Sequence, residues 1–173
     1  MKTLLVVALT VLFLCGCADT TNITQNVAAQ KISIPENSTA YIALPRDGSY
    51  GSTNYTGSGS SVANIIRAAL LKHLVDVEVA RDYQSYQQAL DTSSMRKVDL
   101  MVYPSILHWE DRATEWSAIP DRVSVKIVIV SMASGKVISS VTIDGKSGVA
   151  TFGGDHPQDL LPEPVATYVD SLF

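Results

Sequence analysis

The chain has 173 residues, of which 46% are apolar and 17% are charged, and 13 Lys and Arg stand against 17 Asp and Glu. This length and apolar content suffice for one domain with a buried core, and they exclude a disordered chain. The net charge of −4 argues against a nucleic-acid partner, because such a partner is bound by clustered Lys and Arg.

The first 16 residues have the pattern of a signal peptide. Lys2 supplies one positive charge, and residues 4–14 form an apolar run that only Thr10 interrupts. This run is shorter than the roughly 20 residues that a transmembrane helix needs. We therefore predict that residues 1–16 are a leader that the mature protein lacks.

The leader ends in Leu14-Cys15-Gly16-Cys17, which resembles the lipobox of bacterial lipoproteins. The resemblance implies that the sulfur of Cys17 takes a diacylglyceryl group and that acyl chains anchor this residue in the lipid bilayer. A plain secretory signal and an ordinary membrane anchor are the alternatives. Ala18, where Asp would resemble an inner-membrane retention signal, favours the outer membrane. We expect the domain on the periplasmic side of that membrane.

Residues 17–34 contain this cysteine and a polar stretch without periodicity. We predict a flexible tether here, and about 16 residues of tether would reach roughly 20–25 Å. Residues 35–173 would then form the single folded domain.

In the first half of this domain, strands alternate with helices. Pro45 ends the first apolar strand, and from Val62 the apolar residues recur with helical spacing, with Ser60 or Ser61 as the candidate N-cap. We expect a strand at 39–44, a Gly-rich and Tyr-rich loop at 46–60, a helix from 62 to 74, a strand at 75–80 and a short helix at 82–90.

In the second half, strands dominate. The alternation of apolar residues is strongest at 123–130, and Ser134-Gly135 predicts a hairpin turn after it. We expect strands at 99–107, 123–130 and 137–144, a loop-like stretch at 109–122 and a last helix with an apolar stripe from Val165 to Leu172. The order β-α-β-α-β-β-β-α predicts an α+β fold with a mixed, mostly antiparallel sheet and helices packed on it.

The Gly-rich loop precedes a helix, an arrangement that can hold a phosphate. However, Gly57-Ser58-Gly59 is followed at the third place by Val62 and not by Gly, and no Lys-Ser or Lys-Thr pair follows. Neither the dinucleotide fingerprint nor the P-loop is therefore present, and we predict no cofactor. Tyr50 and Tyr55 make the loop a candidate contact surface for a protein or a glycan.

The segment from His108 to Ser117 combines charged residues with two tryptophans. On an extended backbone, the side chains of His108, Glu110 and Arg112 would point to one side and those of Trp109 and Asp111 to the other. A structural cluster is one interpretation, in which Arg112 pairs with a nearby Glu and the tryptophans cover a sheet edge.

A recognition surface is the second interpretation, because Trp and Arg are favoured anchors at interfaces. The candidate partner-binding residues are Tyr50, Tyr55, Trp109, Arg112 and Trp116. A third interpretation is a metal or acid–base site of His108, Glu110 and His156. We predict no metal and no catalytic residue, because these three residues do not form a coherent motif.

The segments 109–117 (WEDRATEWS) and 119–123 (IPDRV) resemble a hallmark of one family of short proteobacterial lipoproteins, grouped only as a domain of unknown function. Residues 145–147 and 152–157 are similar to that family as well, and the resemblance covers most of residues 35–173. It implies an envelope lipoprotein and brings no activity.

The leading hypothesis is therefore a non-enzymatic, outer-membrane-anchored lipoprotein that binds an envelope partner, either a protein or peptidoglycan or another glycan, as an accessory or assembly factor. A metal-dependent envelope hydrolase and a subunit of a secretion or surface assembly are the alternatives.

Overall fold

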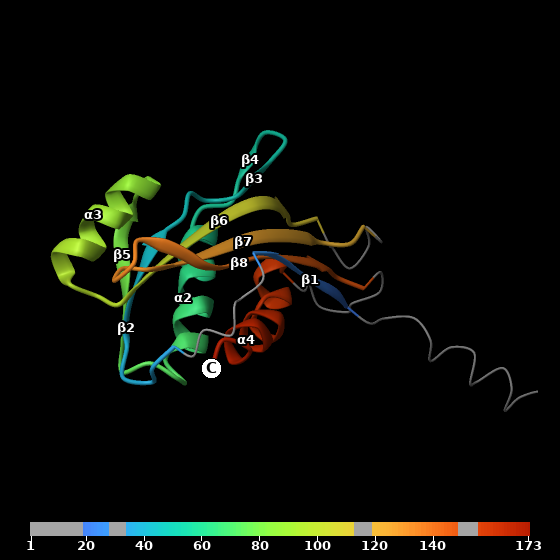
Figure 1. Cartoon of the computed structure of the whole chain (residues 1–173). Coiled ribbons are helices and arrows are strands. Elements are labelled where there is room, and N and C mark those ends of the chain that lie inside the picture. The colour runs from blue at the N-terminus through green and yellow to red at the C-terminus, as the bar shows by residue number, and fades with distance from the viewer. Residues whose placement is uncertain (1–18, 28–33, 113–118, 149–155) are drawn as a thin grey trace, which may run out of the picture.

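The computed structural model describes residues 19–27, 34–112, 119–148 and 156–173. A six-stranded sheet with the order β1-β8-β7-β6-β2-β5 forms the centre of the domain (Figure 1). Its strands are β1 (Thr20–Val27), β2 (Thr39–Leu44), β5 (Asp76–Tyr83), β6 (Leu100–Glu110), β7 (Arg122–Ser131) and β8 (Lys136–Lys146). Neighbouring strands along β1-β8-β7-β6 pair antiparallel, whereas β2 runs parallel to both β5 and β6.

Three α-helices of the described ranges pack on the two faces of this sheet. The helices are α2 (Ser58–Leu70), α3 (Tyr86–Arg96) and α4 (Pro162–Asp170), and a 3-10 helix, η1 (Pro157–Leu160), precedes α4. α2 and α4 lie side by side on one face, whereas α3 covers the other face near β2 and β6 (Figure 1). The predicted α+β fold with a mixed, mostly antiparallel sheet is confirmed.

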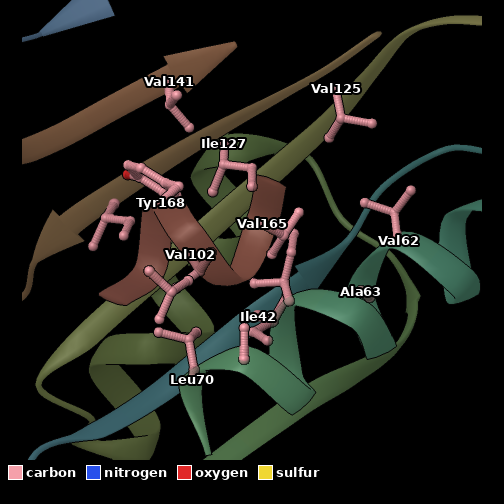
Figure 2. Close-up of a cluster of buried hydrophobic side chains, with 14 of the residues drawn as sticks. Ile42, Val62, Ala63, Leu70, Val102, Val125, Ile127, Val141, Val165 and Tyr168 are labelled. Carbon is pink, nitrogen blue, oxygen red and sulfur yellow. The ribbon is translucent and has the colours of Figure 1, made fainter. Parts of the chain in front are cut away.

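The main core lies between the sheet and the pair α2 and α4 (Figure 2). The alternation in β7 produces it, because Val123, Val125, Ile127 and Ile129 all point to this face and are buried. Each such side chain stabilises the fold by about 1.5–3 kcal/mol when it leaves water. A smaller cluster on the opposite face joins α3 to the sheet through Ala43, Ala89, Met101 and Val130.

The loop before α2 contains a short hairpin, β3 (Ser49–Tyr50) and β4 (Thr53–Asn54). The helix starts earlier than the predicted residue 62, and the predicted N-cap at Ser60 or Ser61 is wrong. Gly57 is the N-cap at φ 92°, and the amide of Gly59 donates instead to Asp47 Oδ1 at 2.8 Å. A carboxylate from the preceding loop thus satisfies one of the free amides of the first helical turn.

β1 is the largest departure from the sequence expectation. The flexible tether that we predicted over residues 17–34 contains an eight-residue strand, Thr20–Val27, which pairs with β8. The strand has no apolar period because it lies at the sheet edge, where Ile23 packs against the core while Thr21 and Asn22 are exposed. No helix of the described ranges is long and apolar enough to cross a membrane.

Two boundaries also differ from the prediction. Asp82 and Tyr83 extend β5, so α3 begins only at Tyr86, where Ser85 and Gln88 form a capping box. β6 continues to Glu110, although we predicted a loop from Trp109 onward. Pairing with β7 satisfies the backbone of these last residues, and a bulge after Ile106 turns the Trp109 side chain into the core.

Candidate functional site

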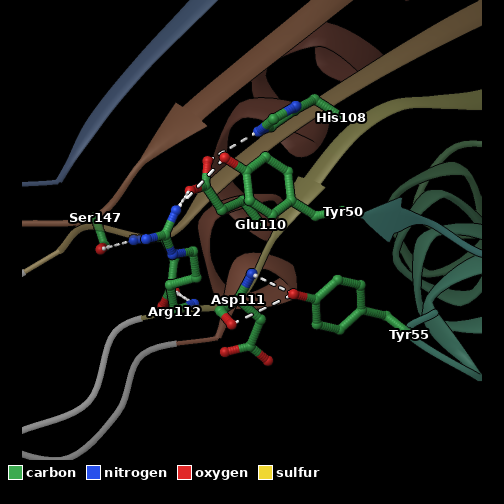
Figure 3. A network of polar contacts seen from close by, with 8 residues as sticks. Tyr50, Tyr55, His108, Glu110, Asp111, Arg112 and Ser147 are labelled. Carbon is green, nitrogen blue, oxygen red and sulfur yellow. Dashed lines mark hydrogen bonds and ion pairs between the residues drawn. The ribbon is translucent and has the colours of Figure 1, made fainter. Parts of the chain in front are cut away.

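The candidate site lies at the end of the sheet where β6 ends and β7 begins. His108, Glu110 and Arg112 share one side of the strand, as the alternation predicted, and the β3–β4 hairpin adds Tyr50 to them (Figure 3). We call these four residues the Glu110 cluster. The site therefore combines one strand with a hairpin that lies more than fifty residues earlier in the chain.

Glu110 is the centre of this cluster. Its Oε1 accepts a hydrogen bond from Arg112 Nη1 at 2.9 Å, and its Oε2 lies 3.1 Å from His108 Nε2. The Tyr50 ring stands edge-on to His108 at 5.5 Å, and the guanidinium carbon of Arg112 lies 5.6 Å from the centre of that same ring. Arg112 thus contacts both the buried carboxylate and the exposed tyrosine.

The Glu110 side chain is an ionised group that the protein buries, since only 6% of the residue is exposed. Burial raises the pKa of this carboxyl, but the hydrogen bonds and charges of His108 and Arg112 outweigh burial and hold the pKa below its ordinary value. In return, Glu110 raises the pKa of Arg112. Glu110 is therefore a carboxylate at neutral pH and serves to orient Arg112.

A second group of contacts lies on the other side of β6. The Tyr55 hydroxyl accepts from the Asp111 amide and donates to the Asp111 carbonyl, both at 3.4 Å. His156 Nδ1, just before η1, lies 3.2 Å from Asp111 Oδ2. These contacts connect the loop before α2 and the segment before α4 to the end of the strand.

A buried link closes this end of the sheet. Asp121, which is fully buried, accepts at Oδ1 from the Arg112 amide at 2.6 Å. Its own amide donates to Ser147 Oγ at 2.9 Å, and its carbonyl accepts from the Ser147 amide at 3.1 Å. Asp121 and Ser147 are not among the predicted site residues, although both lie in the segments that carry the family resemblance.

The structure brings three of the predicted contact residues, Tyr50, Tyr55 and Arg112, to one end of the sheet. Trp109 is not available to a partner, because 2% of the residue is exposed and its side chain lies in the core. The prediction for this residue is therefore corrected. Trp116 and the lipidation candidate Cys17 lie outside the described residues.

The metal alternative finds no support in the described part of the chain. His108 and Glu110 contact each other, whereas His156 contacts Asp111, whose side chain leaves β6 on the opposite side. No group of three His, Cys, Asp or Glu in the described ranges could hold a metal ion.

Comparison with solved structures shows that this fold recurs in other proteins. The chain is similar to PelC from Paraburkholderia phytofirmans, solved as a dodecamer, at 14% identity and a TM-score of 0.63, covering 90% of this chain and 97% of that one. It is also similar to lipoprotein GNA1162 from Neisseria meningitidis, at 14% identity and a TM-score of 0.52, covering 79% and 98%. A third similar structure is protein XCC0632 from Xanthomonas campestris, at 12% identity and a TM-score of 0.50, covering 87% and 90%.

At these identities the three likenesses show the fold alone. A comparison with curated protein sequences gave no match. The model of one family, the domain of unknown function DUF4823, matches residues 32–172. The match spans every described helix and strand except β1, so the chain belongs to the DUF4823 family.

Proposed function

We propose that this protein is a non-enzymatic lipoprotein of the outer membrane, anchored through acylated Cys17, whose Glu110 cluster binds an envelope partner on the periplasmic side. The lipobox Leu14-Cys15-Gly16-Cys17 supports the anchor. The fold supports the class of protein, because it is similar to that of lipoprotein GNA1162. The partner is an envelope protein or a glycan.

The presentation of Arg112 beside Tyr50 is the observation that carries this proposal. The Arg112 side chain is 42% exposed although Glu110 holds it in one orientation, and Tyr50 beside it is 38% exposed. A guanidinium and an aromatic ring that are held in place lose little conformational freedom when a partner binds.

The state of Glu110 supports a binding role over an enzymatic one. A general acid needs a carboxyl whose pKa is raised toward the working pH. The pKa of Glu110 is lowered, and both of its oxygens are already occupied by His108 and Arg112.

Photo-crosslinking in cells tests the binding surface. Benzoylphenylalanine at Tyr50, or at Ser52 in the same hairpin, should give one specific adduct. The same residue at Val75 or Met95, which are 70% and 75% exposed away from the hairpin, should not. Arg112→Gln should weaken the Ser52 adduct. No adduct at the hairpin, or an equal adduct at Met95, would overturn the proposed surface.

The anchor is tested separately. Cys17→Ala should abolish labelling of the protein with radioactive fatty acid and release it from membranes, whereas Cys15→Ala should leave both unchanged. Persistent labelling of the Cys17→Ala protein would refute the anchor.

A subunit of a larger envelope assembly is the second candidate function. The likeness of the fold to that of PelC, which is a dodecamer, favours it, and β5 lies at the outer edge of the sheet. An edge strand carries free backbone donors and acceptors that a second chain can pair with. Native mass spectrometry of the acylated protein should then give one defined oligomer, and a monomer would exclude this candidate.

A further inference from the structure

We propose that Arg122 and Lys146, at the end of the sheet where β1 begins, bind the phosphate of a phospholipid headgroup in the membrane that holds Cys17. The inference rests on the proposed lipid anchor. It adds a second, non-covalent contact with the same membrane and fixes which end of the domain faces the bilayer.

β1 begins close to the proposed anchor. Only Ala18 and Asp19 separate Cys17 from Thr20, the first residue of β1. Three peptide units span at most about 11 Å between Cα atoms. The Asp19 carboxylate also accepts from the Gly148 amide at 3.0 Å, so the chain is attached to the sheet even before the strand begins. An acylated Cys17 would therefore hold this end of the sheet close to the headgroups.

Two cations lie at this end, and neither forms an ion pair with another residue that the structure describes. Lys146 is the direct neighbour of Thr20 on one side and of Arg122 on the other, and both cations are exposed. Like charges directly opposite each other across two strands destabilise a sheet. Glu110 lies opposite Arg122 on β6, but His108 and Arg112 occupy its carboxylate.

Neither Arg122 nor Lys146 has an ion pair within the described ranges. An anion between them would turn this repulsion into attraction. A phosphate suits the position because both side chains can donate charge-assisted hydrogen bonds to its oxygens.

The shape of the surface beside the two cations fits a headgroup. A hollow of about 440 Å³ opens there, and its lining includes Thr20, Asn22, Ser124 and Asp144. Hydroxyl and amide groups can bond the remaining phosphate and glycerol oxygens. Asp144 lies one row farther from the anchored end and can accept from a headgroup hydroxyl or ammonium.

The membrane is favoured over other sources of phosphate because its headgroups would lie close to Lys146. The headgroups lie within about one Debye length of Lys146 once Cys17 is anchored. Each Lys or Arg this close to an anionic membrane surface strengthens binding of the protein to that surface by roughly fivefold. Two cations together would strengthen it by more than tenfold.

The test uses the full, acylated protein in vesicles of phosphatidylethanolamine and phosphatidylglycerol at 3:1 that contain a phosphatidylethanolamine with a headgroup diazirine. After illumination, lipid adducts should map to peptides around Arg122 and Lys146. The variant Arg122→Gln/Lys146→Gln should reduce these adducts at least tenfold. The control Lys126→Gln/Lys136→Gln has the same change of charge on the same two strands, away from the anchored end, and should leave them unchanged.

The outcomes separate this proposal from the anchor on which it rests. Acylated protein without adducts at these peptides, or with undiminished adducts in the double variant, would overturn headgroup binding and leave the anchor intact. Protein that takes up no fatty acid would overturn both. Loss of the adducts in 20 mM inorganic phosphate would show a site for free phosphate and refute the membrane as its ligand. The melting temperature of the double variant should equal or exceed that of the wild type, because a repulsive pair is removed.

Discussion

Gly48 packs against Trp109 so closely that a Cβ atom on Gly48 would stand 2.8 Å from the Trp109 Cγ and 3.2 Å from a methyl group of Ile106. This contact connects the β3–β4 hairpin to the core. Gly48 lies two residues before Tyr50, so this contact fixes the position of Tyr50 relative to His108. The Glu110 cluster therefore depends on a glycine that is not one of its members.

Gly48→Ala should therefore lower the free energy of unfolding by about 1–3 kcal/mol, because an added methyl group has no room in this contact. It should also weaken the proposed Ser52 crosslink. Urea denaturation measures the first effect, and Ser52→Ala, at an exposed position of the same hairpin, is the control. Unchanged stability of Gly48→Ala would contradict the packing described.

Glu110 should make the protein sensitive to acid. A group whose pKa is lower in the folded than in the unfolded state contributes stability above its unfolded pKa, and this contribution is lost as the pH falls through the folded pKa. The free energy of unfolding should thus fall below about pH 4.5, and Glu110→Gln should flatten this fall.

At pH 7 the same substitution should cost about 1–3 kcal/mol, because the hydrogen bonds to a charged acceptor are weakened. Denaturation from pH 3 to pH 7 measures both effects, with Glu36→Gln at an exposed position as the matched control. An equal slope in wild type and Glu110→Gln would disprove the role of this carboxylate.

The buried hydrogen bonds of Asp121 should contribute more to the free energy of unfolding than the contacts of a less buried residue nearby. Asp121→Ala removes the acceptor of the Arg112 amide and should destabilise the protein by about 2–4 kcal/mol. Asp144→Ala, at a half-buried position near the same end of the sheet, should cost less than 1 kcal/mol. Thermal melting of the two variants makes the comparison, and similar costs would argue against the link.

Tyr168 should limit stability in alkali. Burial raises the pKa of its hydroxyl to about 12, against an ordinary value of 10.0, while it donates to Ser139 Oγ at 2.8 Å. A raised pKa in the folded state contributes stability that is complete below pH 10 and disappears as the pH rises toward 12. The two-unit shift corresponds to roughly 3 kcal/mol.

Tyr168→Phe should accordingly lose about 1 kcal/mol at pH 7 and show a shallower fall between pH 10 and pH 12. Tyr83→Phe, at an exposed ring, should behave as the wild type does. The measurement is urea denaturation at fixed pH values across this range, and an unchanged alkaline slope in Tyr168→Phe would count against the buried hydroxyl.

β1 should detach when its core contact at Ile23 is disrupted. Ile23 is opposite Ile143 and packs against the core, so Ile23→Asp would place a charge in an apolar site. Amide exchange of residues 20–27 should then accelerate at least tenfold while that of β7 stays slow. Thr24→Asp, at an exposed position, should have little effect, and slow exchange of β1 in Ile23→Asp would refute this dependence.

The elements with local signals were predicted well from the sequence. Pro45 sets the end of β2, which has the predicted bounds, and the alternation in β7 and the apolar stripe of α4 identify the faces that are buried. These signals depend on neighbours a few residues away, which a single sequence displays.

The elements that depend on distant partners were missed. The polar strand β1 is defined by hydrogen bonds to β8, and no local pattern reports such pairing. The Trp109 prediction failed for a related reason. Before the bulge, the even-numbered residues Leu100, Val102 and Ile106 face the main core. The bulge leaves Leu107 58% exposed and shifts this alternation by one residue, so that Trp109 turns inward and His108 outward.

The pairing of β1 with β8 also sets an order of events. The side chain of Asn26 bonds that of Thr142, 116 residues later in the chain. β1 therefore cannot pair with β8 until most of the protein has been synthesised, and closing so long a loop is among the slower steps of folding. If Cys17 is acylated, the enzymes that process it would meet an extended chain, and the sheet would close onto the membrane only afterwards.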